Sequence, residues 1–173
     1  MQGVSAQGGT NGRVSGGPAS RLAPESELYT ARYRAIATDE AVKVYNGAGC
    51  LPIARAMSFD LMDPAFSSVD MVAAAVLSEV LLCISKEFSR CGENCMDLEG
   101  RASLNMSNPL AVVGVRGIEG TPIIASKEVD VYLFTFLDEP DARAVIDSAL
   151  SHAVLYQTFQ AAFPVTLRCS FAE

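Results

Sequence analysis

The sequence contains few of the residues from which metal centres and hydrolytic sites are built. Its 173 residues include one histidine, His152, and no tryptophan. Cys91 and Cys95 are close enough to suggest a metal pair, but no second close pair of cysteines and no other histidine could complete a zinc site. No Gly-x-Ser-x-Gly sequence marks a nucleophile elbow. We therefore expect no metal and no bound cofactor.

Charged residues are also scarce, at 19% of the chain, and they are mostly acidic. There are 13 lysines and arginines against 20 aspartates and glutamates, which gives a net charge of -7. Residues 1–24 hold two of the arginines and no acid, so the rest of the chain is more acidic still. Phosphate backbones are bound by clustered lysine and arginine. Direct binding of nucleic acid is therefore not expected.

The five cysteines follow no regular spacing, and their number is odd. They are Cys50, Cys83, Cys91, Cys95 and Cys169. No secretory apolar segment comes before them, so we expect reduced thiols in an intracellular compartment.

Residues 1–25 differ in composition from the remainder. They are rich in glycine and serine and have almost no large apolar side chains to bury, so we expect a disordered or targeting tail. In residues 1–24, the two arginines, the serines and the lack of acid are compatible with mitochondrial targeting; otherwise a cytoplasmic location is expected. Residues 26–173 form a single predicted domain.

The stretch 67–90 predicts one long helix, apolar around most of its circumference. Ser67 and Asp70 form an acidic version of the capping box at its start. Glu79 lies in its middle, and a charge at bilayer depth is unfavourable. We therefore expect a helix buried in a core or in a partner, and no membrane span. The apolar positions at helical spacing include Val72, Ala75, Val76, Val80, Cys83, Ile84 and Phe88.

The remaining segments read as strands and one further helix, which predicts an α+β fold. Alternating apolar residues and turn residues mark the strands, and a cap at Asp138 or Asp141 starts the second helix, ended by Pro164. The predicted strands are 28–37, 41–45, 50–59, 96–106, 123–136 and 165–171, with a short apolar run at 110–115, and the second helix is 142–159.

This order of elements resembles the family of osmotically inducible and organic hydroperoxide resistance proteins (OsmC/Ohr). The long helix beginning SSVDMVAAAV, the phrase CMDLEG that follows it, and the closing strand, helix and strand over 127–171 carry the resemblance. The resemblance covers about residues 27–173. It implies antiparallel strands around a long central helix plus a second helix, in an intertwined homodimer.

The resemblance also implies reduction of organic peroxides by a reactive cysteine on the central helix and a resolving cysteine on the later helix. Here the reactive position falls at or near Glu79–Val80, one helical turn before Cys83, and the resolving position falls at His152–Ala153. Both family cysteines are therefore absent from their expected places. Cys83, Glu79 and His152 are the candidate catalytic residues that remain.

Each candidate also has a structural interpretation. Cys83 fits an inert thiol in an apolar stripe, and His152 fits a partly buried histidine held by one hydrogen bond. Glu79 fits a carboxylate paired with Arg32, Arg34 or Arg55, or one that faces solvent. Two functions follow. The first, which we favour, is a non-catalytic OsmC-like protein acting as a structural or assembly subunit of a dimer or larger organellar complex. The second is a thiol-dependent peroxidase that uses Cys83 with an external reductant.

Overall fold

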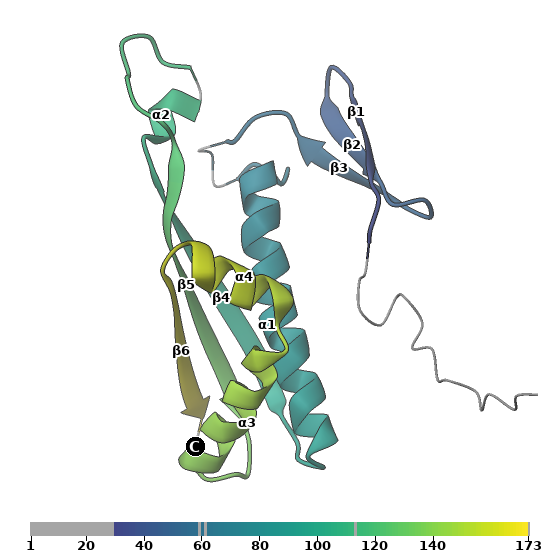
Figure 1. Cartoon of the computed structure of the whole chain (residues 1–173), viewed down its shortest axis with the longest axis vertical. Helices are drawn as coiled ribbons and strands as arrows, with labels where there is room; N and C mark the ends of the chain where they lie inside the picture. The colour runs from purple at the N-terminus through teal and green to yellow at the C-terminus, as the bar shows by residue number, and fades with distance from the viewer. Residues whose placement is uncertain (1–29, 59, 61, 113, 173) are drawn as a thin grey trace, which may run out of the picture. The chain divides into compact units, whose positions relative to one another are not determined.

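A computed structural model describes residues 30–58, 60, 62–112 and 114–172. The predicted tail, residues 1–25, lies outside the described residues. Residues 1–33 and 34–173 form separate units, and all the helices and strands below belong to the second. Over the described residues there are two three-stranded sheets and four helices. Figure 1 shows how the chain runs through them.

The first sheet has the order β1–β2–β3 and is antiparallel throughout. Its strands are β1 (Arg34–Ala37), β2 (Ala41–Tyr45) and β3 (Cys50–Ala54). The predicted hairpin between β2 and β3 is confirmed, with Gly47 at φ 92°, a conformation that glycine adopts without strain. No described residue of these three strands is fully buried.

Two of these strands are shorter than the sequence predicts, because β2 limits the register. Arg34 pairs with Tyr45, the last residue of β2, so residues 30–33 have no partner in this sheet. Ala54 pairs with Ala41, the first residue of β2, so β3 ends there and not at position 59. Positions 28, 29 and 59 lie outside the described residues.

The predicted long helix is α1 (Ser68–Arg90), and the capping box that starts it is confirmed. The Ser67 hydroxyl accepts from the Asp70 N–H, and Asp70 Oδ2 accepts from the Ser67 N–H at 2.9 Å. By length and composition α1 could cross a membrane, but core helices of globular proteins meet the same condition. It contacts β4, α3 and α4, as a core helix does.

The second sheet has the order β4–β5–β6, with β4 (Met96–Ser107), β5 (Ile123–Phe134) and β6 (Val165–Ala172). A loop containing the short helix α2 (Pro109–Val112) joins β4 to β5. β4 and β5 are antiparallel, but β6 runs parallel to β5, which differs from the antiparallel arrangement expected. A helical crossover between β5 and β6 produces this, as parallel neighbours require.

That crossover is two helices, α3 (Glu139–Ser151) and α4 (Val154–Ala162), where the sequence predicts one helix over 142–159. Asp138 is at the N-cap of α3, but its side chain makes no capping hydrogen bond. The chain leaves helical geometry at Ala153, which is fully buried and has φ -84° and ψ 99°. The helix therefore breaks at a residue that is packed into the core.

The core lies between α1, β5 and α3. Val76, Val80, Ile84 and Phe88 form one stripe of α1, and each is fully buried. Apolar residues of β5, of α3 and of the segment that follows α3 complete the core, namely Val129, Val131, Leu133, Ala142, Ile146, Ala149, Leu150, Ala153 and Tyr156. Fully burying a valine, leucine, isoleucine or phenylalanine side chain contributes about 1.5–3 kcal/mol.

Gly100 lets β4 lie close to α1. A Cβ atom added there would come within 2.8 Å of Leu77 Cδ1 and 3.0 Å of Leu81 Cδ2. A larger residue would push these two leucines, and so α1, away from the sheet.

Lys127 is the one lysine of the described chain that is fully buried, and it lies on β5 among apolar residues. Its ammonium donates to the backbone carbonyl oxygen of Ala73 in α1 at 3.0 Å. Burial lowers the pKa of this ammonium from 10.5 to about 8, and no carboxylate forms an ion pair with it in the described chain. A charge here therefore opposes folding at neutral pH.

We expect Lys127→Met to raise the free energy of unfolding at pH 7, by up to about 3 kcal/mol from the pKa difference. Between pH 8 and pH 10.5 the unfolded chain binds more protons at this position than the folded chain, so the contribution of Lys127 to stability improves as pH rises. Urea denaturation at pH 7 and pH 10 measures this, and the advantage of the variant should shrink at pH 10. Lys43→Met, at an exposed position of β2, is the matched control; an equal gain in both variants would contradict the explanation.

Candidate functional site

The centre of α1 carries two of the three residues that the sequence singles out. Glu79 and Cys83 are four residues apart, so they lie on the same side of the helix with about 6 Å between them along its axis. The third residue, His152, lies at the C-terminal end of α3, beside the break before α4. Hydrogen bonds from the start of α4 place Glu79 at the junction between α3 and α4.

Glu79 caps α4 from a different helix. Its Oε2 accepts hydrogen bonds from the N–H groups of Leu155 at 2.7 Å and Tyr156 at 3.1 Å. The N-cap residue of α4 is Ala153, which has no side-chain oxygen to satisfy these groups. The carboxylate therefore acts as the cap of α4. Its negative charge also interacts favourably with the positive end of the helix dipole.

This contact was not predicted. The sequence interpretation paired Glu79 with an arginine or left it facing solvent, but it forms none of the ion pairs in the described chain. The missed signal is the absence of a capping residue before position 154, which is meaningful only once the helix is known to break there.

Cys83 has the electrostatics of an unreactive thiol. It is half-buried, and burial, followed by the neighbouring charge of Glu79, raises its pKa, while Lys86 acts weakly in the opposite direction. The thiolate is the nucleophilic form, so a raised pKa lowers the reactive fraction at neutral pH. No described arginine is among the groups that influence this thiol.

His152 is exposed, so the expectation of partial burial is wrong. It is the C-cap residue of α3, and its Nδ1 lies 2.9 Å from the carbonyl oxygen of Ser148 and 3.0 Å from Ser151 Oγ. These are contacts within the end of its own helix. They hold the ring at the C-terminal end of α3.

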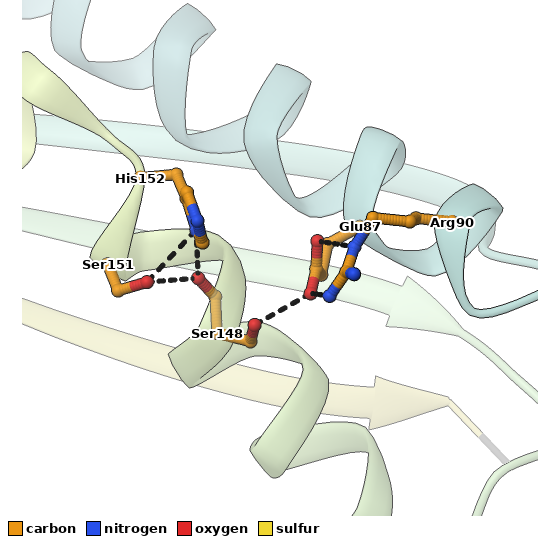
Figure 2. A network of polar contacts seen from close by, with 5 residues as sticks. All are labelled: Glu87, Arg90, Ser148, Ser151 and His152. Carbon is orange, nitrogen blue, oxygen red and sulfur yellow. Dashed lines mark hydrogen bonds and ion pairs between the residues drawn. The ribbon is translucent and has the colours of Figure 1, made fainter.

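A second polar cluster, missed in the sequence interpretation, joins α1 to α3 (Figure 2). Glu87, almost fully buried, accepts from the Ser148 hydroxyl at 2.6 Å and from Arg90 Nε at 2.8 Å. Hydrogen bonds from Arg90 and then Ser148 lower the pKa of Glu87 to about 2. The i,i+3 spacing of Glu87 and Arg90 is visible in the sequence, but the contact with Ser148 depends on the fold.

The other cysteines do not form a redox pair in the structure. Cys50 and Cys91 are exposed, Cys95 and Cys169 are half-buried, and all are free thiols. Burial raises the pKa of both Cys95 and Cys169. Across the described residues no group of three or more histidine, cysteine and acidic side chains is arranged to hold a metal ion.

We expect Glu79→Ala to lower the free energy of unfolding by about 1–2 kcal/mol, as the loss of a helix cap does. The cause would be two N–H groups of α4 left without their acceptor. Urea denaturation followed by circular dichroism measures it, with Glu99→Ala, at an exposed position of β4, as control. If both variants lost the same small amount, the capping role of Glu79 would be refuted.

The sequence matches no protein-family model and no curated protein. Solved structures do match the fold. An OsmC-like protein from Mycoplasma pneumoniae aligns with a TM-score of 0.66 at 9% identity, over 84% of this chain and 99% of that one. The hydroperoxide resistance protein OsmC of Legionella pneumophila aligns at 0.57 with 16% identity, over 83% and 98%. OhrB of Bacillus subtilis, an organic hydroperoxide resistance protein, aligns at 0.54 with 16% identity, over 82% and 98%. The chain therefore has the fold of the OsmC-like and organic hydroperoxide resistance proteins, as its sequence predicts.

Proposed function

We propose that this chain is a non-catalytic member of the OsmC/Ohr family and acts as a structural or assembly subunit in a dimer or larger complex. The observation that carries the proposal is the position of Glu79. Where the resemblance expects a reactive cysteine, the chain has a carboxylate that is bound to the first turn of α4. Hydrogen bonds between Glu79 and α4, which stabilise the fold, thus occupy the position where the resemblance expects the reactive cysteine.

The opposite side of the same junction supports this proposal. The resemblance expects a resolving cysteine at His152–Ala153, where the structure has an exposed histidine that ends α3 and a buried alanine. A sulfenic acid formed on Cys83 would find no resolving thiol there. The usual two-cysteine relay is therefore not available to this chain.

A peroxidase that uses Cys83 with an external thiol is the second candidate. It is supported by one feature, the position of Cys83 on the same side of α1 as Glu79 and one turn further on. Its raised pKa opposes this role, because both causes of the shift favour the neutral thiol over the thiolate.

We expect no turnover of cumene hydroperoxide above background when the purified protein is mixed with a dithiol reductant. The reason is the low thiolate fraction of Cys83 and the missing resolving thiol. Consumption of the peroxide is followed for the wild type and for Cys83→Ser in parallel. Turnover that is well above background and is lost in Cys83→Ser would establish the enzyme instead.

The dimer is supported by apolar surface that one protomer does not cover. Leu82 is 58% exposed, although it lies in the long and largely apolar helix α1. In the first sheet, Ile36 is 37% exposed and Leu51 is 44% exposed. An uncovered helix face and an uncovered sheet, each apolar, are typical of subunits that associate.

We expect the wild type to sediment as a dimer at micromolar concentration and Leu82→Asp to sediment as a folded monomer. Leu82 makes a sharper probe than Val80, because Val80 is fully buried in the core of its own protomer and its replacement would disrupt folding. Ile118→Asp, in the loop between β4 and β5, is the control and should remain dimeric. A monomeric wild type at this concentration would overturn the dimer.

A further inference from the structure

A groove runs along β6, on the side where α3 and α4 lie. Its volume is about 780 Å³ and it is open to solvent. α3 packs mainly against α1, and between α3 and β6 the groove remains. Figure 1 shows β6 at the margin of its sheet, with α3 and α4 crossing beside it.

The strand wall of the groove is the free edge of β6. Six consecutive residues, 165–170, line it. Successive side chains of a strand point to opposite faces, so a cavity on one face would be lined by alternate residues only. In the order β4–β5–β6 the last strand has one neighbour among the described strands, and an edge of this kind presents unpaired backbone N–H and C=O groups.

The opposite wall is one stripe of α3. Arg143, Ile146, Asp147 and Leu150 line the groove at the spacing of a single helix face. Ile146 and Leu150 are almost fully buried, at 2% and 7% exposure, so the accessible lining of the groove is mainly polar. A strand edge that faces a helix across an open groove is the geometry in which an extended peptide adds to a sheet.

The charges on the α3 wall specify which peptide fits. Arg143 is 52% exposed at its side chain, and Asp147 is exposed one helical turn later, about 6 Å along the axis. The two do not pair with each other, because Arg143 binds Glu139. On a strand, residues two apart point to the same side at a separation of about 6.6 Å. An acidic and a basic side chain at that spacing would meet Arg143 and Asp147 together.

We infer that this groove binds an extended segment of a partner protein, which pairs with β6 and carries an acidic and a basic residue two positions apart. The segment adds a strand to the sheet through main-chain hydrogen bonds, and the two charges fix its direction and register. The inference goes beyond the proposed function, since it names a surface and a partner chemistry and holds whether or not Cys83 is reactive.

The test is selection of random octapeptides displayed on phage against the full-length wild-type protein, followed by anisotropy with labelled synthetic copies. We expect enriched peptides to carry an acid and a base two positions apart. Their affinity should fall about tenfold or more with Arg143→Glu, because a like charge replaces the attraction. The double variant Arg143→Glu, Asp147→Arg should bind peptides in which the acid and the base are exchanged.

Controls separate this site from other surfaces. Arg101→Glu, on β4, removes an exposed arginine that also pairs with a nearby glutamate, and it should leave peptide affinity unchanged. Bound peptide should protect backbone amides of β6 from hydrogen exchange, and a central proline in the peptide should abolish binding. The inference would be overturned if the wild type enriched no peptide relative to the Arg143→Glu variant. So would protection of β6 that rises with protein concentration without peptide, since a second copy would then occupy the edge.

Discussion

The rest of the fold depends on covering the 23-residue apolar helix α1, and within one chain only one side of this helix is fully buried. The stripe from Val76 to Phe88 is sealed by β5 and α3, with Gly100 allowing close approach on the β4 side. Leu82 is left outside this arrangement. The positions of β4, α3 and α4 follow from that packing, because all three contact α1. The same helix carries the candidate site, so the site and the core are parts of one structure.

Polar side chains of α1 fix the crossover helices in place. Glu79 holds the start of α4, and Glu87 holds the middle of α3 through Ser148. Both are carboxylates that reach from one helix to another, and each accepts more than one hydrogen bond. For either carboxylate to bind a substrate or move a proton, contacts that support the fold would first have to break. Burial and the charge of Glu79 raise the pKa of Cys83, which lowers the fraction of its nucleophilic thiolate form.

Local signals in the sequence predicted the positions of most helices and strands. Features that depend on tertiary contacts could not be predicted from these signals. The start of α1 was predictable because Ser67 and Asp70 cap it within four residues. The break at Ala153 was not, because no glycine or proline marks it and the compensating acceptor, Glu79, is 76 residues away from Leu155. The lengths of β1 and β3 were overestimated, because the length of β2 and not their own residue pattern limits them. In the candidate site, the helical pattern placed Glu79 and Cys83 on α1, whereas the hydrogen-bond partners of Glu79 and the contact of Glu87 with Ser148 depended on topology.

The parallel pairing of β6 with β5 also affects how the chain folds. β4 and β5 are joined by a loop and can pair early as neighbours in sequence, but β6 reaches β5 only after the crossover of α3 and α4 has been placed. Contacts between residues far apart in sequence form slowly, because closing a long loop loses conformational entropy before the contact can stabilise the chain. The contact from Glu79 to α4 spans an even longer stretch. Assembly of this half of the domain should therefore be the slow phase of refolding, with β6 among the last strands to acquire protection.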